Sequence, residues 1–105
     1  MSTPFDHKQI DDVIHGRVRL AIMAFLASVD EADFAALKAA VSVTDGNLSV
    51  HLRKLEEAGY ITLTKSFVGR RPNTTCTLTD EGRSALVNYV DHIEALLQST
   101  RTLKP

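Results

Sequence analysis

The sequence TDGNLSVHLRKLEEAGYI, residues 44–61 of a 105-residue chain, decides the fold that we expect. Leu48, Leu52 and Leu55 recur at spacings of four and three, which is the period of a helix with one apolar face. Thr44 is a residue type suited to cap the start of this helix, and Gly59 is suited to end it in a left-handed conformation. The pattern therefore predicts a capped amphipathic helix over residues 44–58.

The side of this helix opposite the leucines is polar, and it is mostly basic near its middle. It is formed by Asn47, Val50, Arg53, Lys54 and Glu57, with Ser49 and His51 on its flanks. Asparagine and arginine side chains are suited to bidentate hydrogen bonds with adenine and guanine edges in the major groove. For His51 two interpretations stay open, a donor that lines the groove or a flank residue hydrogen-bonded to the scaffold.

Beyond the glycine the apolar period changes to two, which is typical of half-buried strands. Apolar and polar residues alternate from residue 61 to 67, and the return run 74–78 is rich in threonine. Gly69 permits a tight turn between the two runs, and Pro72 excludes a central ladder position. We therefore expect a two-stranded hairpin over residues 61–78 with Arg70 and Arg71 at its exposed tip.

Basic residues in this hairpin are the second feature that indicates a function. Loop arginines are usually solubilising surface charge. Directly after a polar and basic helix, however, we interpret Arg70 and Arg71, together with Lys65, as contacts to the DNA backbone that flanks the groove. Residues 44–78 carry five basic and three acidic residues, a charge of +2, whereas the whole chain carries −1. We expect weak non-specific binding from so modest a segregation of charge.

Length and composition favour one globular domain over residues 1–105. The content of hydrophobic residues is 44%, and no linker, repeat or apolar run of about 20 residues interrupts the chain. We expect a soluble cytoplasmic protein with no membrane partner. Its single cysteine, Cys76, excludes an internal disulfide, and we expect a half-buried small hydrophobe at that position.

The remaining segments predict the scaffold around the helix and hairpin. A helix over residues 16–29 is apolar nearly all round, so we expect it to be buried on both sides. Asp33 is suited to cap a short helix with Phe34, Leu37 and Val41 inward, and Thr79 is suited to cap a final helix over residues 79–98. A polar and basic helix followed at once by a basic hairpin is the layout of a winged helix. We expect this winged-helix core to cover residues 16–78, between an N-terminal helical segment 1–15 and the final helix.

The final helix also predicts a dimer. Its apolar stripe offers more surface than one small domain would cover, and residues 10–14 add another apolar edge. Burial of both across a two-fold axis is the expected arrangement, because two recognition helices then match two half-sites about one helical turn apart. The residues assigned to this interface are Ile10, Val13, Ile14, Leu86, Tyr89, Val90, Ile93 and Leu97.

The runs DGNLSVHLRKLEEAGYI (45–61), GRRP (69–72) and LTDEGR (78–83) resemble the small winged-helix transcriptional regulators related to the MarR and ArsR families. The resemblance covers roughly residues 14–97 and implies a mainly α fold with a small β-hairpin wing (α+β), a winged helix-turn-helix that dimerises through its terminal helices. It also implies a homodimer on double-stranded DNA, with helix 44–58 in the major groove and the hairpin on flanking backbone or minor groove. One departure is Ser42, which stands where such turns often have glycine.

From the residues and this resemblance we expect a transcriptional regulator, most simply a repressor, that binds a pseudo-palindromic DNA site. An unidentified small-molecule effector is a possible further partner. The residues assigned to DNA contact are Thr44, Asn47, Ser49, Val50, His51, Arg53, Lys54, Lys65, Arg70 and Arg71.

Other classes of function find less support in the sequence. None of the four histidines lies in an H-x-x-x-H pair or beside a cysteine, and no phosphate loop or nucleophile elbow is present. Asp91, His92 and Glu94 faintly resemble a metal-sensing helix of ArsR relatives, but the later histidine is absent. We expect no enzyme, metal or cofactor. The alternative that stays open is a winged-helix module that binds a protein and not DNA, which the acidic balance favours.

Overall fold

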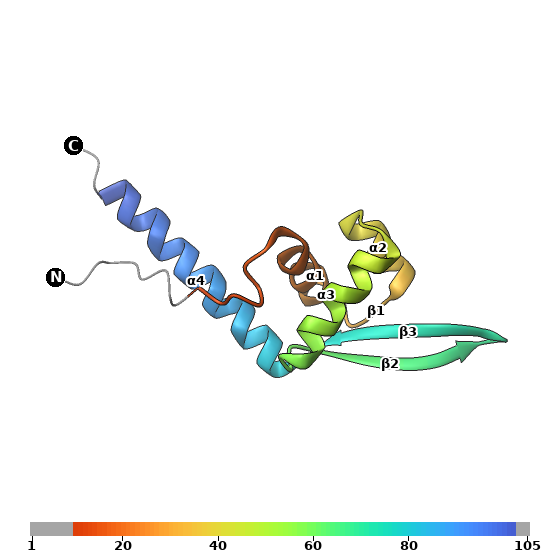
Figure 1. Cartoon of the computed structure of the whole chain (residues 1–105). Helices are drawn as coiled ribbons and strands as arrows, with labels where there is room; N and C mark the ends of the chain where they lie inside the picture. The colour runs from red at the N-terminus through yellow and green to blue at the C-terminus, as the bar shows by residue number, and fades with distance from the viewer. Residues whose placement is uncertain (1–9, 103–105) are drawn as a thin grey trace.

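The computed structural model describes residues 10–102. Along these residues the elements are α1 (Arg17–Ala27), β1 (Ala32–Asp33), α2 (Phe34–Val41), α3 (Asp45–Glu57), β2 (Ile61–Val68), β3 (Arg71–Leu78) and α4 (Asp80–Thr102). Helices α1, α2 and α3 cluster beside the root of the β2–β3 hairpin, the hairpin extends from one side of the cluster, and α4 extends from the other (Figure 1). This confirms the winged helix-turn-helix fold.

Three helices begin at the capping residues that the sequence predicts. The side chain of Asp33 accepts a hydrogen bond from the amide of Ala36 at 2.8 Å, and Thr44 Oγ1 accepts from the amide of Asn47 at 3.2 Å. Thr79 Oγ1 accepts from the amide of Gly82 at 2.9 Å. Each cap satisfies an amide that has no partner within its own helix. The start of each helix is therefore set by local chemistry.

The end of α3 is the predicted glycine ending. Gly59 has a φ of 81°, its amide donates to the carbonyl of Glu56, and the amide of Tyr60 donates to the carbonyl of Leu55 at 3.0 Å. This pair of hydrogen bonds is a Schellman motif. At the turn before α3, Ser42 is left-handed, with a φ of 53° and a ψ of 54°. A residue with a Cβ pays about 1 kcal/mol or more for this conformation, and the tertiary structure tolerates that cost.

The sheet has three strands in the order β1-β3-β2, not the two that the sequence predicts. Ala32 pairs with Cys76 and Asp33 with Thr75, so β1 adds a third strand of two residues beside β3 at the root of the hairpin. A strand this short has no readable alternation of apolar and polar residues. Cys76 therefore lies in a central strand and is fully buried, not half-buried, and burial, then the charges of Glu56 and Asp33, raise the pKa of its thiol to about 11.

The register of the hairpin places the turn at Gly69 and Arg70. Val68 pairs with Arg71 and Phe67 with Pro72, so Arg71 and Pro72 belong to β3. Gly69 has the positive φ, 66°, that the turn requires. Proline is accommodated in β3 because β1 pairs only with Thr75 and Cys76, so the sheet has two strands at Pro72 and β3 has a free edge there.

Residues 12–14 form a turn and none of residues 10–15 is helical, although the sequence predicts a helical segment over 1–15, of which 1–9 lie outside the described residues. Asp11 Oδ1 accepts from the amides of Val13 and Ile14, at 2.8 and 3.3 Å, and Asp11 Oδ2 accepts from the Tyr60 hydroxyl. An aspartate that binds nearby amides in this way competes with helix formation. Burial, then the hydrogen bond and charge of Asp11, raise the pKa of Tyr60 to about 12, so this hydroxyl stays a donor.

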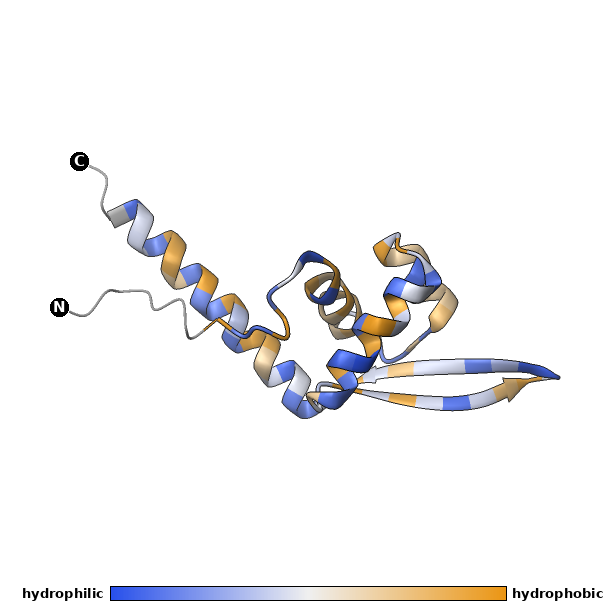
Figure 2. Ribbon diagram, viewed as in Figure 1, coloured by the Kyte–Doolittle hydropathy of each residue, from blue (hydrophilic) through white to orange (hydrophobic). Residues whose placement is uncertain are grey.

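The core lies among α1, α2, α3 and the root of the sheet. Its buried apolar side chains are Ile14, Ile22, Met23, Leu26, Ala32, Leu37, Leu48, Leu52, Leu55, Ile61, Cys76 and Tyr89. Helix α4 contributes few of them, yet apolar residues recur along it toward its free end (Figure 2). None of the described helices combines the length and hydropathy that crossing a bilayer requires.

The start of α4 is held against the end of α3 by backbone contacts. The amide of Thr79 donates to the carbonyl of Tyr60 at 3.0 Å, and its hydroxyl donates to the carbonyl of Gly59 at 2.6 Å. A Cβ added at Gly82 would lie 2.1 Å from the Tyr60 carbonyl oxygen. Glycine is therefore required at residue 82 because two backbone segments approach closely there, which is a tertiary constraint.

Candidate nucleic-acid interface

Helix α3 is anchored by the leucine stripe and presents its polar side outward. Leu48 and Leu55 are fully buried and Leu52 is 3% exposed, whereas Val50, on the opposite side, is 52% exposed. The predicted DNA-contacting residues on this outward side that are exposed are Thr44, Asn47, Ser49, Val50, Arg53 and Lys54. The structure thus groups these side chains on one face, and the hydroxyl oxygen of Thr44 also serves as the helix cap.

A groove of about 580 Å³ separates α3 from the wing. Its lining residues come from α2, α3 and both long strands: Phe34, Ser49, Leu52, Arg53, Glu56, Leu63, Lys65 and Thr74. Arg53 and Lys65, which are distant in sequence, bring two cations to this groove, while Glu56 adds one carboxylate. The groove is therefore a mixed surface in which the basic residues of two elements face the same space.

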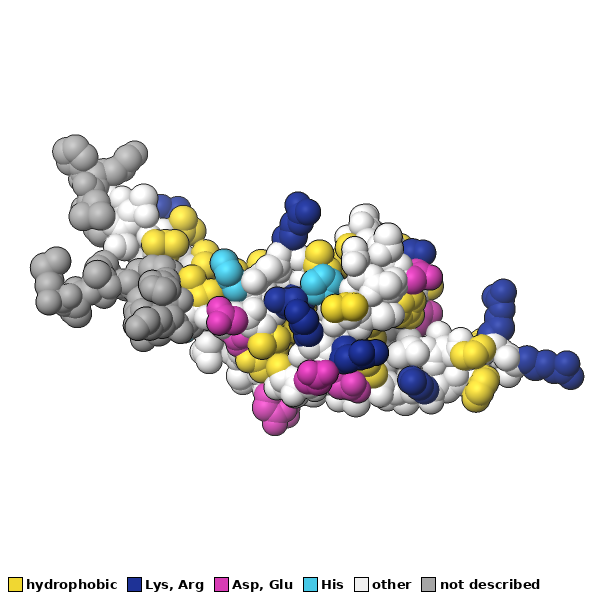
Figure 3. Space-filling model, in the orientation of Figure 1, with side chains coloured by type: hydrophobic (Ala, Val, Ile, Leu, Met, Phe, Trp, Pro, Cys, Tyr) yellow, Lys and Arg dark blue, Asp and Glu magenta, His cyan; other side chains and the backbone are white. Residues whose placement is uncertain are grey.

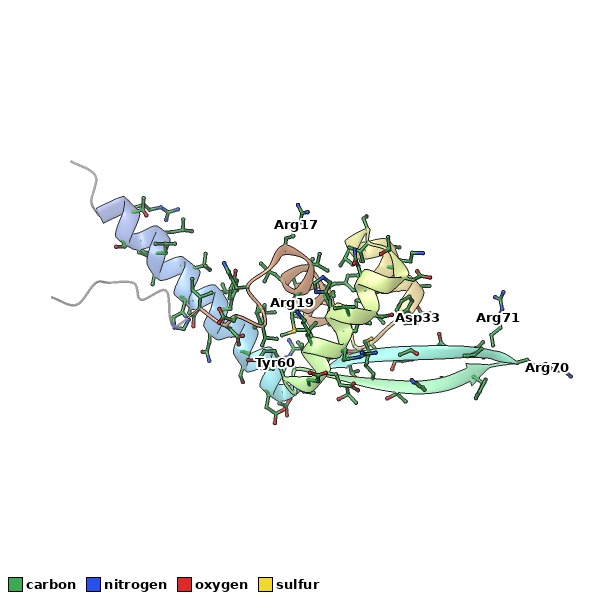
Figure 4. All side chains as sticks on the ribbon, in the orientation of Figure 1. Arg17, Arg19, Asp33, Tyr60, Arg70 and Arg71 are labelled. Carbon is green, nitrogen blue, oxygen red and sulfur yellow. The ribbon has the colours of Figure 1, made fainter. Side chains whose placement is uncertain are left out.

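The opposite edge of α3 is tied to α1 by Arg19. Its Nη1 donates to His51 Nδ1 at 3.1 Å, its Nε donates to the carbonyl of Val13 at 2.5 Å, and its Nη2 donates to the carbonyl of Asp12 at 3.4 Å. In Figure 4 Arg19 lies between α1 and α3, and Arg17 points away from the body of the protein. A hollow of about 400 Å³ adjoins this edge, lined by Asp12, Val13, Arg19, Lys54, Glu57 and Ala58.

The environment of His51 favours its neutral form. Burial, then the charges of Arg19 and Lys54, lower the pKa of its imidazole. Because the guanidinium of Arg19 has no acceptor atom, the Nδ1 atom of His51 must accept this hydrogen bond. The hydrogen bond to the scaffold, one of the two interpretations of His51, is therefore present, and it occupies Nδ1.

Arg19 is a basic residue beside α3 that sequence reasoning did not assign to the site. Its signal was charge on a helix that is otherwise apolar nearly all round. Arg19 and Lys54 line the hollow at one edge of α3, whereas Arg53 and Lys65 line the groove at the other edge. Figure 3 shows Lys and Arg side chains spread over this face toward the wing tip. Basic side chains therefore lie along both edges of the helix.

The wing tip extends beyond the rest of the domain. Arg70 and Arg71 project from its end, as predicted (Figure 4). Phe67 and Val68 beside them are 70% and 66% exposed, although the alternation predicts a half-buried Phe67. The difference arises because the hairpin outreaches α3 in Figure 1, so no helix covers its last residues.

Acidic groups limit the basic character of the surface. Asp45, in the first turn of α3, pairs with Lys38 at 2.7 Å, but the two side chains are 70% and 47% exposed, so the pair contributes little to stability. Glu56 and Glu57 are exposed at the other end of α3. The outward face is therefore basic in its middle and at its edges and acidic at the end nearest α4.

The residues assigned to a dimer interface divide into three groups. Ile14 is fully buried and Tyr89 is 7% exposed, because the fold of a single chain already covers them; they lie beneath any interface, not on its surface. Ile10, Val13, Leu86 and Ile93 are partly buried against the core. Val90 and Leu97 are 49% and 47% exposed, and the structure adds Val87 and Leu96, at 53% and 38%.

Two histidines near α4 have different environments. His15 Nδ1 and the Tyr89 hydroxyl are 3.0 Å apart and share a hydrogen bond. His92 Nδ1 is buried without a partner among residues 10–102. Within that range no three of the histidine, cysteine, aspartate and glutamate side chains are grouped as metal ligands would be.

Comparisons of the sequence with known proteins identify its family. A family model described as a winged helix DNA-binding domain matches residues 18–97. An uncharacterised protein of Methanocaldococcus jannaschii is 38% identical over 81 residues, which are 77% of this chain and 88% of that protein.

Solved structures lead to the same result. A transcriptional regulator homologue from Pyrococcus horikoshii superposes with a TM-score of 0.77 and 30% identity, over 84% of this chain and 87% of that one. A MarR family regulator of Streptomyces coelicolor, solved in complex with DNA, has a TM-score of 0.69 and 20% identity, over 92% and 65% of the two chains. An ArsR family regulator also shares the fold. The chain belongs to the family of winged helix DNA-binding domains.

Proposed function

We propose that this protein is a sequence-specific transcriptional regulator, and that α3 reads its DNA site from the major groove. The observation that carries the proposal is the placement of α3: its apolar side is buried, and its outward side presents Asn47 and Arg53, with Lys54 and Arg19 at one edge and Lys65 at the other. A helix in the major groove meets base edges along its middle and phosphates on both walls. The arrangement of polar and basic groups on α3 corresponds to these two kinds of contact.

The wing supplies a second contact in this proposal. Arg70 and Arg71 stand at the end of a hairpin that extends past α3, so they would contact the backbone or minor groove next to the bases that α3 reads. Arginine suits this place because it can donate to phosphate oxygens and enter a narrow minor groove.

We further propose that two copies bind a pseudo-palindromic site. Four apolar side chains of α4 are 38% to 53% exposed in one chain. Apolar side chains that stay exposed together on one element favour an interaction site. An isologous contact between two α4 helices would cover it and place two α3 helices on two half-sites. Such a dimer bound over a promoter would act as a repressor. An unidentified small-molecule effector is also part of the proposal, and it is supported by a structural neighbour solved in complex with 4-hydroxyphenylacetate.

Selection of bound sequences from random double-stranded DNA tests the proposal directly. We expect enrichment of an inverted repeat with half-site centres about one helical turn apart. Transcription in vitro from a promoter that overlaps the enriched site should then fall as protein is added. Failure to enrich any sequence would contradict the proposal, and enrichment of a single half-site would contradict its dimeric part.

A second candidate function is a module that binds another protein through α3. The exposed Glu56 and Glu57 and the net charge of −1 favour it, because both oppose binding to a polyanion. The two functions predict opposite results for Arg70 and Arg71. Their replacement weakens DNA binding if the wing contacts DNA, and it has no effect on a protein contact made by α3 alone.

A further inference from the structure

Arg19 restricts the chemistry of His51 more than an ordinary contact would. Its guanidinium is held by three hydrogen bonds, two to backbone carbonyls at residues 12 and 13 and one to His51 Nδ1. The carbonyls fix the position of the guanidinium, and the guanidinium can only donate. The imidazole ring is therefore oriented by a group that requires its Nδ1 to carry no proton.

The other ring nitrogen then has a defined role. A neutral imidazole with an unprotonated Nδ1 must carry its proton on Nε2, which makes Nε2 a donor. His51 is partly buried, and its Nε2 is not among the buried atoms without a partner in the described part of the chain. The Nε2–H group therefore reaches solvent, and no described side chain is bonded to it.

The position of His51 on α3 places this donor at one edge of the outward face. His51 follows Asn47 by four residues and precedes Lys54 by three, so the three side chains form one row along the helix. This row lies on the α1 side, opposite the groove that faces the wing. The groups around the ring are the cations of Arg19 and Lys54, while the carboxylates of Asp12 and Glu57 line the neighbouring hollow.

We propose that His51 is a donor-only DNA contact, with Arg19 as its positioning residue: Nε2–H donates to an acceptor atom of the DNA. This rests on the proposed DNA-binding function and adds the chemistry of one edge of α3. Several DNA atoms accept and do not donate, and of these we propose a purine N7 or a phosphate oxygen as the acceptor. Because the ring is neutral, the contact adds affinity without releasing a counterion, in contrast to Lys54 in the same row.

The tautomer can be tested without DNA. Long-range ¹H–¹⁵N correlation spectra of the free protein near neutral pH should show His51 protonated at Nε2 and unprotonated at Nδ1. Arg19→Met should reduce this preference to the weaker one that a free imidazole has for the same tautomer, and Arg19→Lys, which keeps a cationic donor, should restore part of the difference. A wild-type ring protonated at Nδ1 would overturn the proposal. Should Arg19→Met fail to fold, the wild-type spectrum alone decides this step.

The DNA contact is tested on the site that selection enriches. His51→Ala should weaken binding about three- to tenfold, the range for one neutral hydrogen bond, and leave the salt slope unchanged. The matched variant Lys54→Ala should lower the salt slope by about one unit. A change in salt slope for His51→Ala, or unchanged affinity, would overturn the contact. Circular dichroism and a thermal melt confirm that each variant is folded.

Modified DNA distinguishes the two acceptors. If a purine N7 accepts, 7-deazapurine at one position per half-site should weaken wild-type binding and leave His51→Ala unaffected. If a phosphate accepts, a methylphosphonate at one position should weaken wild-type binding and leave the binding of His51→Ala unaffected. Equal effects on both proteins at every position would overturn the proposal. If wild-type protein enriches no sequence, the proposed function fails; if it binds DNA but His51→Ala binds equally well, only this inference fails.

Discussion

Helices α3 and α4 are both amphipathic, but they leave opposite kinds of surface uncovered. In α3 the apolar side is covered by the chain itself, with Leu48 and Leu55 fully buried, and the exposed side is polar. In α4 the chain covers only part of the stripe, and Val90 and Leu97 remain about half exposed. The difference indicates two kinds of partner, a polar and charged polymer for α3 and a second apolar surface for α4.

This contrast shows why the pattern of one helix does not by itself reveal its role. An apolar stripe predicts burial without identifying the surface that covers it. For α3 the cover is the intramolecular core, whereas α4 extends away from the cluster formed by α1, α2 and α3 (Figures 1 and 2). The substitutions below test whether the two helices have the separate roles that this difference suggests.

The largest effect is expected for a charge in the exposed stripe of α4. Val90→Glu should place a carboxylate in a dry interface, at a cost of several kcal/mol unless it is neutralised or paired. Dimerisation and DNA binding should fail together, because the second recognition helix gains its effective concentration only through the dimer. Analytical ultracentrifugation beside a DNA titration measures both.

Val50→Glu is the matched control on α3, since Val50 and Val90 are 52% and 49% exposed. This substitution should leave the dimer intact and weaken DNA binding, because it places a carboxylate on the side of α3 that would face the major groove of the DNA. A Val90→Glu protein that sediments as a dimer, or a Val50→Glu protein that becomes a monomer, would break the assignment of roles to the two helices.

A second pair of substitutions compares the starts of the same helices. Gly82→Ala should destabilise the protein by about 1–3 kcal/mol or more, because its Cβ would meet the backbone oxygen of Tyr60 at 2.1 Å. Gly46→Ala has open space around its Cβ and should stabilise α3 by about 0.4–1 kcal/mol. Chemical denaturation gives both free energies of unfolding. Equal stability of the two variants would show that α4 can shift away from Tyr60 freely.

The polar face of α3 is tested by Asn47→Ala and Arg53→Ala. Replacement of a residue that reads a base should cost about 1–3 kcal/mol of binding free energy on the selected site and far less on random DNA. Fluorescence anisotropy titrations on the two DNAs give the difference. Losses of the same size on both would show that these residues position the helix and do not read bases.

The smallest effect per residue is expected at the wing. Arg70→Ala with Arg71→Ala should weaken binding to all sequences similarly and reduce the salt slope by about one or two phosphate contacts per subunit. Sequence preference should not change, because the tip would contact backbone and not base edges. A salt titration with an unchanged slope would remove the wing from the DNA contact.

Most of the local structure could be predicted from the sequence because its causes are local. A cap at Thr44 needs only an amide three residues later, and the ending at Gly59 needs only a residue that tolerates a positive φ. The leucine period and the hairpin pattern depend on neighbours within a few residues of one another. Such interactions are present in the order of the residues, before any packing is known.

Long-range contacts were decided only by the tertiary structure. Strand β1 exists because Ala32 and Asp33 meet β3, and Gly82 is constrained because Tyr60 approaches it. Neither feature has a signal in the sequence around it, because each depends on a contact with a distant part of the chain. The sequence likewise predicted an apolar edge at residues 10–14, but only packing shows that Ile14 belongs to the core of its own chain while Val90 stays exposed.

The same division holds within the candidate site. The grouping of residues on the outward face of α3 was predictable from the sequence, because helical periodicity dictates it. It left two interpretations of His51, since a choice between them required knowing which side chain lies beside the ring. Arg19, 32 residues earlier in the chain, supplies that neighbour only when α1 packs on α3, and its lack of an acceptor atom then determines which nitrogen of the imidazole is left to donate.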